Sequence, residues 1–129
     1  MKNYYLFFLL LTFHFSLFTV VSASQSDAYY HYLFGNIAQM KGEYPQAIEE
    51  YKKSTLYDNG SVYLKKQLVN LYILTGDTKA ASEVLSEISK VTPADQSTSE
   101  LMAELSIYNK KPEDAISVYE KILSSAPAN

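Results

Sequence analysis

The chain has 129 residues, of which 47% are hydrophobic and 19% are charged, and its formal net charge is -3. This composition suffices for one small globular domain with an apolar core. All 11 basic residues are lysine, so the chain has neither the arginine forks nor the basic surface that nucleic-acid binding needs. The absence of cysteine excludes disulfides, thiolate catalysis and zinc–thiolate sites.

The N-terminal segment is a candidate export signal. Lys2 gives it a positive start, and residues 4–21 are almost uninterrupted apolar sequence. We expect a signal peptide over residues 1–23, cleaved after the small residue Ala23, and a linker over residues 24–27. The remainder of the chain would then be secreted or periplasmic.

An uncleaved membrane anchor over residues 4–21 is the alternative interpretation of the same segment. The apolar run has 18 residues, which is the lower edge for a spanning helix. His14 in its middle makes stable spanning less favourable. In either case membrane contact is expected only through this segment, and the rest of the chain leaves the cytosol.

After the linker, residue types recur at intervals of 34 positions. The recurrent sets are Ala47, Ala81 and Ala115; Gly42 and Gly76; Tyr51, Leu85 and Tyr119; Phe34, Leu68 and Met102; and Pro93 and Pro127. A fixed period of this length predicts stacked copies of one supersecondary unit. We expect three units, over residues 28–61, 62–95 and 96–129.

Each unit is expected to fold as two helices joined by a short turn. In the first unit the helices are predicted over residues 28–41 and 44–57, with Gly42 in the left-handed conformation that ends a helix. Gly76 has the same role in the second unit, and Asp77 should cap the helix after it. First helical turns are expected to contain Pro45 and Pro112, where proline is tolerated. The second helices are expected to end before Pro93 and Pro127, because proline cannot continue a helix.

The last unit departs from this scheme at its turn. Lys110 stands where the other units have glycine, and a positive φ would cost it about 1 kcal/mol. The neighbouring Asn109 is therefore expected to take that conformation instead. Ser97 and Glu100 have the spacing of a capping box, which predicts that they open the first helix of this unit.

The pattern resembles the tetratricopeptide repeat. The matching residues are Phe34, Gly35, Ala47 and Tyr51; Leu68, Tyr72, Ala81, Leu85 and Pro93; and Met102, Ala103, Ala115, Tyr119 and Pro127. The departures from the family pattern are His31, Lys65 and Ser99 for tryptophan, Val69 for glycine and Asn59 for proline. The resemblance implies an all-α, right-handed α-solenoid of three helix–turn–helix repeats. Its six helices would follow the apolar signal or anchor helix.

The resemblance also implies a binding surface, because the first helices of this family line a concave groove. The groove residues that it implies here are Tyr29, Tyr32, Asn36, Tyr63, Lys66, Asn70 and Glu104. The carboxamides of Asn36 and Asn70 offer both donor and acceptor to an extended peptide, although asparagine is also a tolerated polar residue on a solvated helix. Lys66 with Asn70 is similar to part of a carboxylate clamp, but Glu100 and Glu104 stand where such a clamp needs polar and basic groups.

No residue pattern in the chain points to catalysis, a cofactor or a metal. His31 is the only histidine after the N-terminal segment and is expected to be structural, because no second histidine or cysteine accompanies it. Glu49 and Glu50 are expected on a solvated helix face. The leading interpretation is an exported, non-enzymatic module that binds a peptide or protein segment as an adaptor or assembly factor in the cell envelope.

The final helix pair suggests a different interpretation. Val118, Ile122 and Leu123 would be partly uncovered, since a solenoid normally finishes with a polar-faced element. The chain would then be the N-terminal part of a longer repeat protein, a structural module that forms homo-oligomers through this uncapped pair, or a monomer that tolerates the exposure.

The proposed register makes Leu85, in the middle unit, a core residue between neighbouring units. Leu85→Ala should lower the free energy of unfolding by about 2–4 kcal/mol, because it leaves a cavity in that core. Thermal unfolding followed by circular dichroism measures the loss. An unchanged melting temperature would refute the register.

Overall fold

The computed structural model describes residues 25–92 and 95–125, the last of these without its side chain. Helices joined by short turns account for these residues, and no strand occurs among them. The helices are residues 25–40, α2 (Tyr44–Tyr57), α3 (Val62–Thr75), α4 (Thr78–Val91), α5 (Gln96–Tyr108) and α6 (Pro112–Ser125). The predicted all-α solenoid is thus confirmed. The signal or anchor segment lies outside the described residues.

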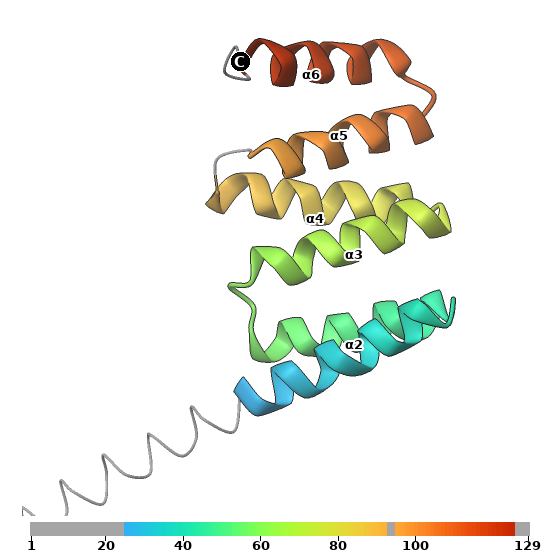
Figure 1. Cartoon of the computed structure of the whole chain (residues 1–129), viewed down its shortest axis with the longest axis vertical. Coiled ribbons are helices and arrows are strands. Elements are labelled where there is room, and N and C mark those ends of the chain that lie inside the picture. The colour runs from blue at the N-terminus through green and yellow to red at the C-terminus, as the bar shows by residue number, and fades with distance from the viewer. Residues whose placement is uncertain (1–24, 93–94, 126–129) are drawn as a thin grey trace, which may run out of the picture.

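The helices form one stack that follows the chain order. Figure 1 shows helix 25–40 and α2 at one end of the stack and α6 at the other. α3 contacts α2, α4 and α5, and α5 also contacts α4 and α6. The contact between α3 and α5 places two first helices side by side, as a solenoid of helix pairs requires. The unit boundaries at residues 61 and 95 remain predictions.

None of the described helices is long and apolar enough to cross a membrane. Residues 4–21, for which an anchor was considered, lie outside the described part of the chain.

The glycine turns are as predicted. Gly42 has φ of 77° and Gly76 has φ of 79°, in the left-handed region where a side chain would be strained. The carboxylate of Asp77 accepts a hydrogen bond from Ala80 N at 3.1 Å and so caps α4. Pro45 lies in the first turn of α2, whereas Pro93 and Pro127 lie outside the described residues.

The prediction for the third turn was wrong. Lys110 takes the positive φ, 58°, while Asn109 has φ of -77°. The reason lies in the hydrogen bonds that close the helix. Lys111 N donates to Ser106 O at 2.9 Å, as Glu43 N does to Ala38 O after Gly42, and this closure needs the residue before the donor to be left-handed. The position in the unit, and not the residue type, decides the conformation.

The predicted start of α5 was also wrong. Asp95 is the N-cap, and its carboxylate accepts from Thr98 N at 2.8 Å. The capping box of Ser97 and Glu100 does not form, because Ser97 lies inside the first turn and Glu100 accepts from Gln96 Nε2 at 2.9 Å. An N-cap two residues earlier gives the helix an extra half turn.

Small residues at the positions that recur every 34 residues lie where the paired helices pack together. Ala47, Ala81 and Ala103 are 0% exposed, and Ala115 is 3% exposed. Leu68, Leu85 and Tyr51 are buried beside them as predicted. They belong to two core clusters, one between the first and second units and one between the second and third.

Two residues that were expected to fill the space between helices are exposed instead. Phe34 is 43% exposed and Tyr119 is 41% exposed. Met102, which occupies the position of Phe34 in the third unit, is half-buried. Phe34 and Tyr119 lie on the outermost described helices, where one side has no described helix against it. On α6, Val118 is half-buried and Leu123 is 74% exposed, in agreement with the expected uncovered pair.

Gly35 on helix 25–40 leaves room for the ring of Tyr51 on α2. A Cβ atom at this position would lie 2.7 Å from Cδ1 and 2.8 Å from Cε1 of Tyr51. The Tyr51 ring is 1% exposed, and its hydroxyl donates to Gln39 Oε1 at 2.9 Å. The ring therefore has little room to move away.

Gly35→Ala should lower the free energy of unfolding by about 1–2 kcal/mol, because the clash with Tyr51 outweighs the helix propensity that alanine gains. Urea unfolding measures this difference. Gly60→Ala is the matched control, since a Cβ there meets nothing within 4 Å and its φ is not positive. If Gly35→Ala were as stable as Gly60→Ala, the close approach would be incorrect.

Candidate functional site

Two side-chain contacts join the first helices of the three units into one surface. The hydroxyls of Tyr32 and Tyr63 are 3.2 Å apart, which links helix 25–40 to α3. Lys66 Nζ donates to Ser97 Oγ at 2.8 Å, which links α3 to α5. The predicted groove residues on these helices are spaced three and four residues apart, so they form stripes on one face of each helix.

Tyrosines gather at the N-terminal end of this surface. The ring centroids of Tyr29 and Tyr32 are 6.3 Å apart, and those of Tyr32 and Tyr63 are 5.9 Å apart with an interplanar angle of 64°. Tyr32 also stacks at 6.0 Å on Tyr51, which is buried. Tyr29 is 62% exposed and Tyr63 is 55% exposed. A cluster with a fixed base and two exposed rings results.

An open pocket of about 850 Å³ lies beside these rings. Its lining comes from helix 25–40, the end of α2, the turn after it and the start of α3. The lining residues are Gln25, Ala28, Tyr29, Tyr32, Ser54, Tyr57, Asp58, Ser61, Tyr63 and Leu64. We call this site the tyrosine pocket.

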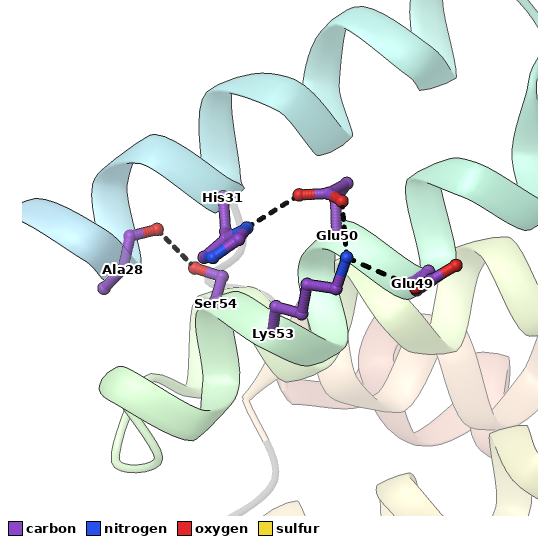
Figure 2. Close-up of polar contacts among 6 residues, drawn as sticks. All are labelled: Ala28, His31, Glu49, Glu50, Lys53 and Ser54. Atoms are coloured by element: carbon purple, nitrogen blue, oxygen red, sulfur yellow. Dashed lines mark hydrogen bonds and ion pairs between the residues drawn. The ribbon is translucent and has the colours of Figure 1, made fainter.

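Two polar residues of the tyrosine pocket hold its walls together. Ser54 is 0% exposed, and its hydroxyl donates to Ala28 O at 2.7 Å, which fixes α2 to helix 25–40 (Figure 2). Ser61 Oγ accepts from Leu64 N at 3.3 Å and caps α3. These two hydrogen bonds hold the helix ends that line the pocket.

Two tyrosines of this cluster, Tyr51 and Tyr63, have raised pKa values. The hydrogen bond with Tyr32, and to a smaller extent burial, raises the pKa of the Tyr63 phenol above its usual value of 10.0. Burial raises the pKa of Tyr51 to about 12. The pocket offers aromatic rings and phenolic hydroxyls, which suit both apolar and hydrogen-bonding contacts.

Three residues of the pocket lining were not predicted from the sequence. Ser54 and Tyr57 belong to the end of α2 and Asp58 follows it, whereas only first helices were expected to line the groove. Asp58 precedes the turn at residues 59–60. A carboxylate at the junction between two units is the signal that could have placed it near the tyrosines.

The remaining predicted groove residues lie outside the tyrosine pocket. Asn36 is half-buried, and Asn70 and Glu104 are exposed. Among the described residues, no hydrogen bond joins either asparagine to the tyrosines. They extend the stripes of Tyr32 and Tyr63 along their helices without contacting them.

Lys66 has a different environment from the one that the carboxylate-clamp similarity would need. Its ammonium donates to both carboxylate oxygens of Asp95 at 2.8 Å, and its side chain is only 15% exposed. The Lys66 ammonium, followed by the hydrogen bonds from Thr98, holds the pKa of the Asp95 carboxyl well below its usual value of 3.8. This charge thus connects two units.

A second polar cluster consists of His31, Glu49, Glu50 and Lys53 (Figure 2). His31 Nδ1 donates to Glu50 Oε2 at 2.7 Å, because a carboxylate can only accept, and the His31 ring stacks on Tyr57 at 5.8 Å. Lys53 binds Glu50 at 2.9 Å and Glu49 at 3.2 Å. The cluster ties helix 25–40 to α2, which is the structural role expected of His31.

The expectation that Glu50 lies on a solvated face was wrong. Its side chain is 15% exposed, against 70% for Glu49, because His31 and Lys53 cover it. The hydrogen bonds from His31 and then Lys53 lower the pKa of Glu50 below its usual value of 4.5. No group of three or more histidine, aspartate or glutamate side chains in the described ranges has a metal-binding arrangement.

The fold agrees with a comparison against protein families. The tetratricopeptide repeat model matches residues 38–105, which is more than half of the chain. This chain belongs to the tetratricopeptide repeat family. Tetratricopeptide repeats generally mediate protein–protein interactions, and the family is typically non-enzymatic. A comparison with curated proteins finds no match.

The ion pair of Lys66 and Asp95 predicts a pH dependence of stability. Because the folded-state pKa of Asp95 is lowered, the stabilisation is fully present above about pH 4 and is lost as pH falls through the folded-state value. Asp95→Asn keeps an N-cap side chain but removes the charge. The melting temperature should therefore differ most between wild type and variant near pH 7, and the difference should shrink towards pH 2.

The matched control is Glu104→Gln, at an exposed carboxylate that forms none of the ion pairs between described residues. Its effect on the melting temperature should be small at every pH. A difference for Asp95→Asn that stays constant from pH 7 to pH 2 would contradict the ion pair.

Proposed function

We propose that this tetratricopeptide repeat protein is exported and binds a peptide or protein segment in the groove lined by its first helices. It would act as a non-enzymatic adaptor or assembly factor in the cell envelope. The observation that carries this proposal is the tyrosine pocket, an open site of about 850 Å³ at one end of the predicted groove. Export rests on the signal-like sequence of residues 1–23.

The tyrosine pocket has the properties of a binding hot spot. Tyrosine supplies a large contact area with few rotatable bonds, so little conformational entropy is lost when a partner binds. Tyr32 is already held between Tyr51 and Tyr63. The exposed rings of Tyr29 and Tyr63 are then available on a fixed base.

Asn36 and Asn70 support an extended ligand. Asn36 lies one helical turn after Tyr32, and Asn70 lies one helical turn after Lys66. Tyr32 and Lys66 are the residues that contact the next first helix. A carboxamide can both donate to and accept from a peptide backbone. A segment anchored at the tyrosines would therefore meet hydrogen-bonding side chains as it continues along the groove.

Self-association through α6 is a second candidate function. Ile116, Tyr119 and Leu123 are 57%, 41% and 74% exposed, and their spacing places them on one side of the helix. An exposed apolar stripe of this kind supports contact with a second copy or another protein. In this case the end of the stack, and not the groove, would carry the function.

Affinity capture from an envelope extract separates the two functions. Tyr29→Ala combined with Tyr63→Ala should reduce recovery of the bound partner at least tenfold, because hot-spot truncation costs more than about 1.4 kcal/mol. Asn36→Ala with Asn70→Ala should give a smaller reduction. Recovery is measured by quantitative mass spectrometry against the wild-type chain.

Leu123→Glu is the matched variant on α6 and should leave recovery unchanged. If Leu123→Glu abolished capture while both groove variants retained it, the groove would not be the binding surface. Melting temperatures of all variants establish that a loss of capture is not a loss of folding.

A further inference from the structure

The tyrosine pocket has an unbalanced negative charge. Of the described residues that line it, Asp58 is the one aspartate, glutamate or lysine. The described ion pairs of the molecule use Glu49, Glu50, Glu87 and Asp95 as their acids, and none uses Asp58. A carboxylate at a pocket without a cation sets the charge of a complementary ligand.

The backbone around Asp58 is fixed. Asp58 N donates to Ser54 O at 3.0 Å, and Asp58 O accepts from Ser61 N at 3.2 Å. The hydroxyls of Ser54, Ser61, Tyr32 and Tyr63 already form the hydrogen bonds described above. These hydrogen bonds do not involve the Asp58 carboxylate, which is therefore a strong hydrogen-bond acceptor for a ligand in the pocket.

The aromatic rings favour the same charge. The face of a tyrosine ring carries negative electrostatic potential and attracts a cation within about 6 Å of its centroid. Tyr29 and Tyr63 are both more than half exposed and line the pocket with Asp58. Ring faces and carboxylate therefore act together on one bound group.

We infer that the tyrosine pocket binds the guanidinium group of an arginine in an extended partner segment. The inference rests on the proposed groove function and specifies its ligand. A planar guanidinium can stack on a tyrosine ring and donate two hydrogen bonds to a carboxylate, whereas a lysine ammonium is a compact, strongly hydrated charge. The chain itself contains no arginine, so a second copy cannot supply this group.

An NMR titration tests the inference with small probes. The labelled chain, purified after expression with its whole N-terminal segment, is titrated with N-acetylarginine methylamide and with the N-acetylcitrulline analogue, which has a similar shape but no charge. The arginine probe should shift the ring resonances of Tyr29 and Tyr63 and bind about tenfold tighter than citrulline. Nα-acetyllysine methylamide, which keeps its charged ε-ammonium group, should bind more weakly than the arginine probe.

Two matched variants assign the effect to the carboxylate. Asp58→Asn should reduce the affinity for arginine to that for citrulline, and Glu120→Gln, which changes an exposed carboxylate on α6 outside the pocket, should leave the tenfold ratio intact. Tyr63→Leu should weaken arginine binding, whereas Tyr108→Leu, at an exposed tyrosine that does not line the pocket, should not.

Equal affinity for arginine and citrulline, or no shift at either tyrosine, would overturn the inference. It would also be overturned if lysine bound as tightly as arginine or if Asp58→Asn retained the ratio. The groove function is judged separately by the capture experiment. Loss of capture in the tyrosine variants, together with equal arginine and citrulline affinities, would retain groove binding and reject only the arginine ligand.

Discussion

The close approach of helix backbones within each unit is the constraint on which the rest of the structure depends. Gly35 leaves room for the ring of Tyr51, and fully buried alanines have the same role in the other helix pairs. Tyr51 in turn supports Tyr32, and Tyr32 contacts Tyr63 on the next unit. A side chain larger than hydrogen at position 35 would displace Tyr51, and with it Tyr32 of the tyrosine pocket. The packing of the first helix pair therefore also positions the pocket.

Charges in this molecule have two distinct uses. Most described ion pairs hold helices in place: Glu50 joins helix 25–40 to α2 through His31, and Asp95 joins α5 to α3 through Lys66. Asp58 differs, because it is the one aspartate, glutamate or lysine among the described residues that line the tyrosine pocket. A carboxylate beside tyrosines at the junction of two units would give the proposed groove an electrostatic preference that its helical framework alone does not have.

The repeat period determined much of the fold in advance. The recurrent alanines mark where paired helices pack together, and the recurrent glycines mark where first helices end. The bounds of α2 and the turns at Gly42 and Gly76 could therefore be predicted. Residue preferences were less reliable: they favoured Asn109 over Lys110 for the left-handed turn, and hydrogen-bond closure decided otherwise. Tyr29, Tyr32 and Tyr63 were predicted because they lie on first helices, whereas the contributions of Tyr57 and Asp58 depend on how two units meet.

Photocrosslinking tests most directly whether the tyrosine pocket is where this protein meets its partner. p-Benzoylphenylalanine is placed at position 63 in one variant and at position 123 in another, and crosslinked peptides are sequenced by mass spectrometry after irradiation in the envelope extract. Position 63 should yield one recurrent partner segment that contains an arginine, and position 123 should yield none. Crosslinks from position 123 alone, to a second copy of the chain, would contradict the account.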